Sequence, residues 1–262
     1  MTTDAPETAP PRKKHSGPVR VVVETIVLVA VAVVLALIVK TFFVQAFYIP
    51  SVSMEPGLKV NDRILVEKPS YWFGGSPQRG DVVVFADPGG WLDADADAPP
   101  TGTVGRALAR IGLYPTGGHL VKRVIGVAGD TVHCCDPRGR IEVNGTPLDE
   151  SSFIARQEEC DGPMEQSDGT YSGGCKGWTA TVPKGRLFVM GDNRGDSADS
   201  SYHLCSPPQL QAAKTNPREA RRCENAFVPV NLVVGKVVAL VWPASRFTFL
   251  NRPSTFDDVR SP

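Results

Sequence analysis

The sequence has no excess of charge, few histidines and no cysteine before residue 134. Its 28 basic residues are balanced by 28 acidic ones. A nucleic-acid-binding protein usually carries a basic excess on its binding face, so this balance argues against a nucleic-acid partner. Only 4 histidines are present, and no Cys-x-x-Cys pair gives a recognisable zinc-ligand spacing. The sequence therefore predicts neither a nucleic-acid partner nor a metal site.

Long apolar segments are also scarce. The run TIVLVAVAVVLALIV at 25–39 is uncharged and, with its flanks, reaches the roughly 20 residues that a bilayer-spanning helix needs. A later run, LVVGKVVALVW, is too short for a second span and carries Lys236. A cleaved secretory signal is the alternative reading, because such a signal also follows a basic segment. No small-x-small cleavage pattern comes next, which favours a retained anchor over residues 19–45.

Charge around this run predicts its orientation. Positive residues remain on the cytoplasmic side of a membrane, so a cytoplasmic N-terminal tail, expected to be disordered over 1–18, is predicted. One pass through the plasma membrane then places a domain of residues 46–262 outside the cell, in contact with the lipid bilayer. The basic residues that precede the run are Arg12, Lys13, Lys14 and Arg20.

All 6 cysteines follow the anchor, in a compartment that is expected to be oxidising. One to three disulfides are therefore favoured over a metal site, but the spacing does not determine which cysteines pair. The cysteines fall in an insertion at about 134–180 and in a loop at about 204–226. They are Cys134, Cys135, Cys160, Cys175, Cys205 and Cys223.

The outer domain is predicted to be mostly β. Short apolar runs alternate with turn residues, and the chain contains 25 glycines and 23 prolines. A helical segment is expected at Val104–Tyr114, after an acidic low-complexity stretch. Strands are expected at Asp62–Glu67, Asp81–Ala86, His119–Val127, Arg140–Val143, Arg186–Met190 and Val233–Trp242.

Three segments carry residues with catalytic potential. In FYIPSVSMEPGL, at 47–58, Pro50 and Pro56 restrict the backbone around Ser51 and Ser53, so that a serine hydroxyl can be presented outward. A Ser-Pro-rich linker would have a similar composition. This segment alone therefore leaves both interpretations open.

The second segment, HLVKRVIGVAGD at 119–130, has Lys122 inside an apolar strand. Burial lowers the pKa of a lysine, and a neutral lysine can act as a general base for a serine hydroxyl. A lysine that faces solvent on an alternating strand is the other interpretation. The third segment, MGDNRGDSADSSYH at 190–203, can be a turn or can orient a neighbouring amine, and its spacing does not match an EF-hand calcium loop.

Taken together and in this order, the three segments resemble the signature boxes of bacterial type I signal peptidases, which are Ser–Lys serine proteases. PSVSMEPGL resembles the nucleophile box, VKRVIGVAGD the lysine box and GDNRGDSADS the Gly-Asp-Asn-Arg box. RGDVVVF and VGKVVALVWP also fit, so the resemblance extends from the anchor to Pro243. It implies an antiparallel β-sheet catalytic domain that removes signal peptides from secretory preproteins without a cofactor.

The resemblance also implies a role for individual residues. Ser53 would be the nucleophile and Lys122 its general base. The Ser51 hydroxyl and the Ser53 N–H would stabilise the oxyanion. Ser197 would orient the lysine, with Asp199 behind it. Shallow substrate pockets would be lined by Phe47, Ile49, Pro50, Met54, Leu58 and Val121.

One departure from the family pattern affects the support of this site. Arginine is common in the family where this chain has Ser201, so the expected ion-pair partner of Asp199 is missing, and Arg123 or Arg194 is expected to replace it. Two other functions remain in competition. A self-cleaving repressor-type protease shares the Ser–Lys chemistry but is soluble and has a DNA-binding domain. A non-catalytic, membrane-tethered binding module would be expected to have lost Ser53 or Lys122.

Overall fold

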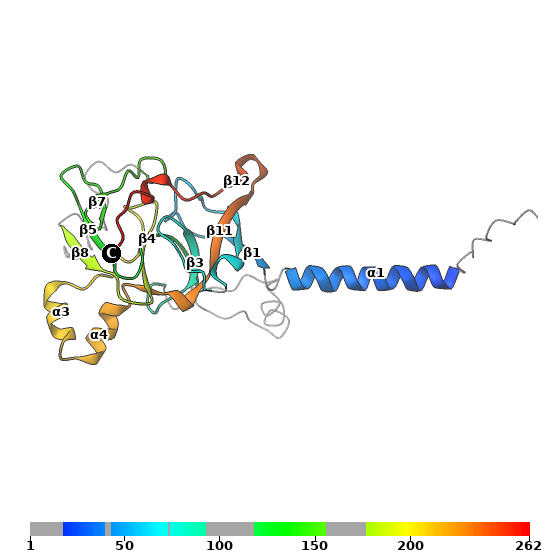
Figure 1. Cartoon of the computed structure of the whole chain (residues 1–262), viewed down its shortest axis with the longest axis horizontal. Coiled ribbons are helices and arrows are strands. Elements are labelled where there is room, and N and C mark those ends of the chain that lie inside the picture. The colour runs from blue at the N-terminus through cyan, green and yellow to red at the C-terminus, as the bar shows by residue number, and fades with distance from the viewer. Residues whose placement is uncertain (1–17, 40–42, 73, 93–117, 156–176) are drawn as a thin grey trace, which may run out of the picture. The chain divides into compact units, whose positions relative to one another are not determined.

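A computed structural model describes residues 18–39, 43–72, 74–92, 118–155 and 177–262. These residues belong to two compact units, which lie within Met1–Lys40 and Thr41–Pro262. The first contains one helix and the second contains the strands (Figure 1). The helix expected at Val104–Tyr114 lies outside the described residues.

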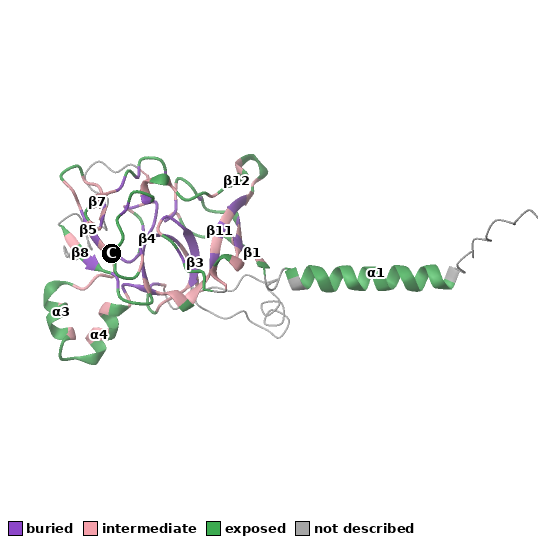
Figure 2. Cartoon of the chain, in the orientation of Figure 1, coloured by how far each residue is buried: buried purple, intermediate pink, exposed green. Residues whose placement is uncertain are grey.

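Helix α1 covers Pro18–Ile38. Proline is well suited to a first helical position, where its missing N–H has no helical partner to lose. The window Val19–Leu37 has a mean hydropathy of 2.6, and its residues are exposed (Figure 2). Its 19 residues correspond to about 28 Å of helix, close to the thickness of a bilayer's hydrocarbon core. This helix fits a transmembrane helix.

The larger sheet of the second unit contains eight strands among the described residues, in the order β1-β2-β11-β3-β4-β9-β10, with β12 paired to β11. All of its pairings are antiparallel. The strands are β1 (Val44–Tyr48), β2 (Arg63–Glu67), β3 (Val82–Ala86), β4 (His119–Gly126), β9 (Arg186–Met190), β10 (Val228–Pro229), β11 (Val233–Trp242) and β12 (Thr248–Phe249).

A second sheet of four strands follows the order β7-β6-β5-β8. Its hairpin turn at Asn144 and Gly145 has positive φ at both residues, as an Asn-Gly turn between two strands requires. The strands are β5 (Thr131–Cys134), β6 (Glu142–Val143), β7 (Thr146–Pro147) and β8 (Trp178–Thr181).

Each of the six segments expected as strands contains an observed strand, and the mostly antiparallel β fold is confirmed. The start of the domain differs from the expected boundary. The sequence predicts an anchor over 19–45, whereas Val44 and Gln45 pair with Glu67 and Val66 as the first residues of β1. The sequence FFVQAFYI is apolar except for Gln45, so hydropathy alone does not separate the end of a membrane helix from a half-buried strand.

Apolar side chains pack on both faces of the larger sheet, and its central strands are largely buried (Figure 2). One cluster, which we call the loop-supporting cluster, contains three residues of the segment between β1 and β2. It consists of Ile49, Met54, Leu58, Ile64, Val66, Val82, Val84, Val237 and Leu240. Another contains Val83, Phe85, Trp91, Leu120, Val124, Leu187, Val189 and Val228. Strand β4 lies between β3 and β9, so its side chains enter the centre of the domain.

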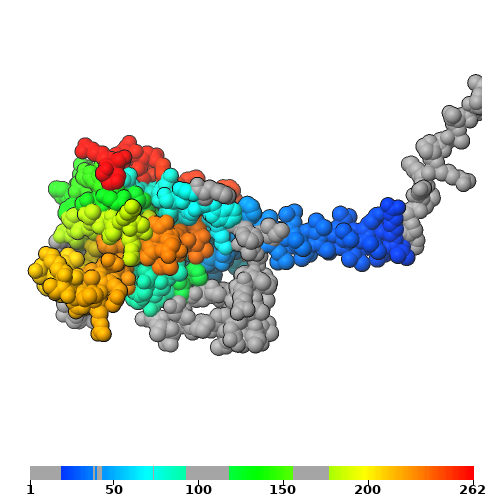
Figure 3. Space-filling model, turned by 60° about the horizontal axis from the view of Figure 1, so that its bottom comes forward, coloured from blue at the N-terminus to red at the C-terminus, as the bar shows by residue number. Residues whose placement is uncertain are grey.

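Two short helices, α3 (Pro207–Ala213) and α4 (Pro217–Glu224), form a hairpin within the loop expected at about 204–226. The helices lie together on one side of the domain (Figure 3). Cys205 and Cys223 form a disulfide that joins the two ends of this hairpin, and Cys134 and Cys135 form another. The remaining cysteines, Cys160 and Cys175, lie outside the described residues.

Asp130 joins several segments beneath the second sheet, and its replacement is expected to destabilise the domain. Its carboxylate accepts two hydrogen bonds from Arg79, at 2.6 and 2.5 Å, and one from the Asn144 amide at 2.8 Å. Asp130 is fully buried, whereas the Arg79 side chain is 16% exposed. Asp130→Ala is therefore expected to lower the free energy of unfolding by about 2–4 kcal/mol, measured by denaturant unfolding of the full chain in detergent.

The matched control is Asp257→Ala. Asp257 pairs with Arg252 at 2.7 Å, but their side chains are 56% and 37% exposed. Exposed pairs contribute about 1 kcal/mol or less. Equal losses in the two variants would contradict the importance given to Asp130.

Candidate active site

The segment between β1 and β2 forms a closed loop that carries Ser51 and Ser53. The Ile49 N–H donates to the Asp62 carbonyl at 2.9 Å, and the Asn61 N–H returns a bond to the Ile49 carbonyl at 3.0 Å. Met54 lies in the loop-supporting cluster and anchors the loop to the sheet. Ser53 is 7% exposed, Ser51 is more exposed, and their hydroxyl oxygens are 3.2 Å apart. We refer to residues 49–61 as the serine loop.

Arg246, which follows β11, fixes the other end of the serine loop. Its guanidinium pairs with Asp62 at 2.5 Å and donates to the Gly57 carbonyl at 3.0 Å. The Asp62 carboxylate also accepts the N–H of Lys59 at 2.7 Å. Because Asp62 is only 2% exposed, these contacts hold the loop rigidly against the sheet.

Lys122 lies in the middle of β4, opposite Val83 of β3, and is 3% exposed. Burial lowers its pKa to about 8, against the opposing effect of the negative charges of Asp199, Asp192 and Asp196. The interpretation of Lys122 as a solvent-facing residue is therefore wrong. A substantial fraction of this amine is neutral near pH 8, as a general base requires.

The polar segment 191–203 follows β9 and contacts the serine loop. The Asn193 N–H donates to the Ser53 carbonyl at 3.0 Å, and the Asn193 amide donates to the Val52 carbonyl at 3.2 Å. A side chain at Gly191 would collide with the Ser53 carbonyl and the Ser197 hydroxyl. Glycine at this position therefore permits the close approach of the two segments.

Ser197 and Asp199 form a buried pair in this polar segment. The Ser197 hydroxyl donates to the Asp199 carboxylate at 2.6 Å, and the two residues are 7% and 1% exposed. The same carboxylate accepts the Gly191 N–H at 2.9 Å, the Ser201 N–H at 3.0 Å and the Ser201 hydroxyl at 2.6 Å. These four neutral donors occupy the roughly four acceptor positions of a carboxylate.

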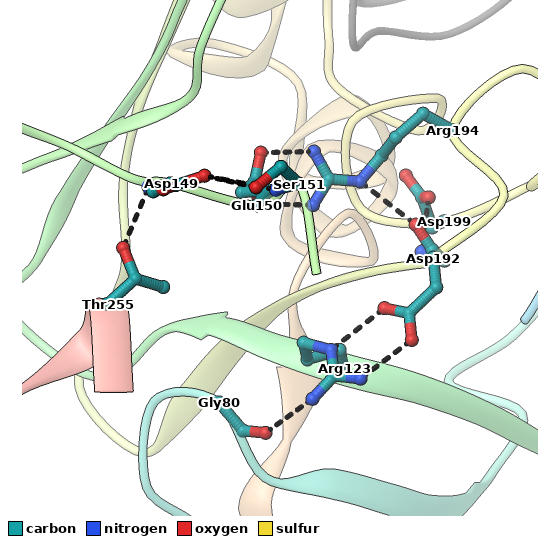
Figure 4. A network of polar contacts seen from close by, with 10 residues as sticks. Gly80, Arg123, Asp149, Glu150, Ser151, Asp192, Arg194, Asp199 and Thr255 are labelled. Atoms are coloured by element: carbon teal, nitrogen blue, oxygen red, sulfur yellow. Dashed lines mark hydrogen bonds and ion pairs between the residues drawn. The ribbon is translucent and has the colours of Figure 1, made fainter. Parts of the chain in front are cut away.

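The two arginines expected to replace the missing partner of Asp199 form other ion pairs (Figure 4). Arg123 pairs with Asp192 through two hydrogen bonds, at 2.8 and 2.7 Å. Arg194 pairs with Glu150 through two more, at 2.9 and 2.5 Å. Each pair connects the segment that carries Ser197 to a different part of the domain. The hydroxyl and N–H donors, rather than an arginine, surround the Asp199 carboxylate.

The residues expected to line the substrate pockets differ in exposure. Ile49, Met54 and Leu58 are at most 2% exposed and pack within the loop-supporting cluster. They support the surface from beneath. The three others are accessible: Phe47 and Val121 are partly buried, and Pro50 is exposed.

Comparisons with known proteins identify the family to which this chain is similar. The model of the family "Signal peptidase, peptidase S26" matches residues 22–242. Signal peptidase I of Mycobacterium tuberculosis (strain CDC 1551 / Oshkosh) is 39% identical over 256 residues, which cover 93% of this chain and 79% of that protein. Signal peptidase I of Leptolyngbya laminosa is 31% identical over 253 residues, which cover 96% of both proteins.

The chain belongs to the signal peptidase family. A probable signal peptidase I of Mycobacterium leprae (strain TN) is also similar, with 38% identity over 86% of this chain and 77% of that protein. The resemblance found in the sequence is thereby confirmed. As a signal peptidase, the chain is a serine protease that removes signal peptides, and the comparisons give no support to a non-catalytic binding module.

Sequence reasoning missed three contacts around His203 and Trp91. The His203 ring stacks on Trp91, with centroids 4.6 Å apart, and its Nδ1–H donates to the Asp199 carbonyl at 2.8 Å. Burial lowers the pKa of His203. Trp91 in turn donates its indole N–H to the Asn225 carbonyl at 2.8 Å. Because Trp91 and Asn225 are far from His203 in sequence, no local pattern could have indicated this contact.

Proposed function

We propose that the chain cleaves secretory preproteins at the outer surface of the plasma membrane, with Ser53 as nucleophile and Lys122 as general base. The burial of Lys122, beside the polar segment that bonds to the Ser53 carbonyl, is the observation that carries this proposal. A buried amine with a pKa of about 8 can accept the proton of a serine hydroxyl at moderate pH.

The proposed reaction has two steps. The Ser53 oxygen attacks the peptide carbonyl carbon while its proton passes to the Lys122 amine. The resulting ammonium then protonates the leaving nitrogen, and the C–N bond breaks to give an acyl-enzyme. In the second step, Lys122 takes a proton from water, and the resulting hydroxide attacks the ester carbonyl carbon. The lysine ammonium then returns this proton to the Ser53 oxygen as the ester C–O bond breaks, which releases the acid product and restores Ser53 and Lys122.

Ser51 is proposed to stabilise the oxyanion together with the N–H of Ser53. The Ser51 hydroxyl lies 3.2 Å from the Ser53 hydroxyl, so a donor is available beside the atom that attacks. Donors that are already in place lower the energy of the negative charge that develops on the carbonyl oxygen. Ser197 and Asp199 are proposed to orient Lys122.

Strand pairing supports an extended substrate. Among the described strands, residues 119–122 of β4 pair only with β3, because β9 pairs from Arg123 onward. Strand β1 likewise pairs only with β2 among these strands. The rings of Phe47 on β1 and His119 on β4 are 5.5 Å apart, so the two strands are close where both have an available edge. An extended peptide can add to such an edge, with alternate side chains entering shallow pockets.

Helix α1 is proposed to anchor the protein in the bilayer with its N-terminus in the cytoplasm. Its length and hydropathy suit a span, and the basic residues of the N-terminal segment favour this orientation. Ser53 follows the end of α1 closely in sequence, which suits substrates whose signal helices are in the same membrane.

The proposed substrate preference can be tested with purified full-length protein in detergent. A model preprotein with alanine at the first and third positions before the cut is expected to release its mature chain, and N-terminal sequencing identifies the site. A matched preprotein with phenylalanine at the first position is expected to be cleaved at least about a hundredfold more slowly, because shallow pockets exclude a large ring. Equal cleavage of both would contradict the pocket assignment, and no cleavage of either would contradict the proposed function.

A further inference from the structure

We propose that Ser201 is a positioning residue for the general base, acting through the carboxylate of Asp199. This inference rests on the proposed Ser53–Lys122 mechanism and deepens it. Ser201 is 1% exposed and donates both its hydroxyl, at 2.6 Å, and its N–H, at 3.0 Å, to Oδ1 of Asp199. The position where the family commonly has a cation is thus occupied by a neutral residue that binds the same carboxylate.

The two oxygens of Asp199 have different partners. Oδ1 accepts both bonds from Ser201, whereas Oδ2 accepts the Ser197 hydroxyl at 2.6 Å and the Gly191 N–H at 2.9 Å. Ser201 therefore prevents the carboxylate from rotating away from Ser197. Charge-assisted hydrogen bonds of this length are among the stronger ones in proteins.

The orientation of Asp199 determines what Ser197 can offer to Lys122. A serine hydroxyl has one proton, and in Ser197 that proton is used toward Asp199. Only acceptor positions remain on the Ser197 oxygen. An N–H of Lys122 can donate to such an acceptor, which leaves the lone pair of the amine directed at the nucleophile.

The charges around Lys122 also make Ser201 relevant to the pH dependence of kcat/KM. Asp199, Asp192 and Asp196 each favour the protonated form of Lys122. Asp192 is paired with Arg123, and Arg194 is paired with Glu150. His203 faces Lys122 as well, and burial lowers its pKa, which favours its neutral form. The four groups that donate to the Asp199 carboxylate carry no net charge, and the Ser201 O–H dipole directs its positive end at that carboxylate.

Removing the Ser201 hydroxyl is therefore expected to have two effects. Lys122 loses its fixed orientation, so kcat falls about tenfold while KM changes little. The less compensated Asp199 carboxylate holds the Lys122 proton more strongly. The acidic limb of kcat/KM then moves to higher pH, by on the order of half a pH unit.

The experiment measures kcat and KM against pH for the full-length protein in detergent, with a model preprotein as substrate. Ser201→Ala is expected to show both effects, and Ser201→Thr, which keeps the hydroxyl, is expected to restore the wild-type values. The matched control is Ser200→Ala. Ser200 is also fully buried, but its hydroxyl accepts the Val189 N–H at 2.9 Å. This control is expected to leave the pH profile unchanged, even if it lowers the melting temperature.

A second variant and a second comparison keep the test decisive. If Ser201→Ala does not fold, Ser201→Cys takes its place in the test. Its thiol is a weaker donor of similar size, so the acidic limb of kcat/KM is expected to move in the same direction by a smaller amount. Unchanged kcat and pH profiles in the folded Ser201 variants, with Lys122→Met inactive, would overturn the role of Ser201 alone. Full activity of Lys122→Met would instead overturn the proposed function on which this role depends.

Discussion

Replacing Lys122 by methionine is expected to reduce preprotein cleavage by about a thousandfold or more, without unfolding the protein. The serine hydroxyl is a weak nucleophile unless a base removes its proton in the transition state. Methionine has a similar length and no basic nitrogen, so it can occupy the buried position on β4 without taking that proton. Ser53→Ala is expected to be equally inactive. The double variant is expected to be no worse than either single one, because the two residues act as a unit.

The pKa of Lys122 gives this prediction a second, independent measurement. Burial lowers that pKa to about 8, so the fraction of neutral amine falls about tenfold per pH unit below that value. The value of kcat/KM is expected to rise with pH up to about 8 and then to level off. A wild-type activity that remains constant down to pH 6 would contradict the assignment of Lys122 as the base.

The stability of the variant separates a chemical defect from a folding defect. The folded pKa of Lys122 lies below its unfolded value, so the unfolded state binds more protons and stability rises with pH between about 8 and 10.5. Below pH 8 the buried ammonium is unfavourable, and methionine removes that cost. Lys122→Met is therefore expected to be at least as stable as wild type at pH 7, measured by thermal unfolding. Lys184→Met, at an exposed lysine before β9, is expected to keep full activity.

Six of the twelve described strands lie within the segments that the sequence predicted as strands, because the signals there are local. Runs such as Arg186–Met190 are short, apolar and bounded by turn residues, and they became strands with little change in bounds. Lys122 stood out because it interrupts a largely apolar run, and in the sheet it lies opposite the buried Val83 of β3. The spacing of Ser197 and Asp199 likewise placed them in one segment, where they form a hydrogen bond.

The rest of the site depends on contacts between distant segments. Arg194 and Glu150 are separated by 44 residues, and neither has a local pattern that identifies the other. The expected pocket residues show a second limit of sequence-based prediction. Apolar character alone did not distinguish the buried Met54 from the exposed Pro50, because a core and a shallow pocket use the same side chains. For Asp199, the missing arginine was evident in the sequence. That hydroxyl and N–H donors take its place is visible only in the structure.

Breaking the Arg194–Glu150 pair is expected to cause the largest loss of stability at this site. The two side chains are 0% and 2% exposed, and their bidentate contact joins the catalytic polar segment to residues 149–151 (Figure 4). Glu150→Ala leaves a guanidinium in the interior with its main counter-charge removed. Losing one partner of a buried pair costs about 3–5 kcal/mol, which denaturant unfolding of the full chain would measure. Cleavage is expected to fall as well, because the neighbouring Asn193 holds the Ser53 carbonyl.

Two comparisons show whether burial is the cause of this loss. Glu224 pairs with Arg186 at 3.3 Å, but the Glu224 side chain is 59% exposed, so Glu224→Ala is expected to cost about 1 kcal/mol or less. The double variant Glu150→Leu with Arg194→Met removes both charges and keeps apolar volume, so it is expected to recover much of the stability lost in Glu150→Ala. It should not recover full activity if Arg194 also shapes the segment that carries Ser197. A loss below about 1 kcal/mol in Glu150→Ala would mean that water or other groups compensate the arginine, and that this pair does not hold the catalytic segment in place.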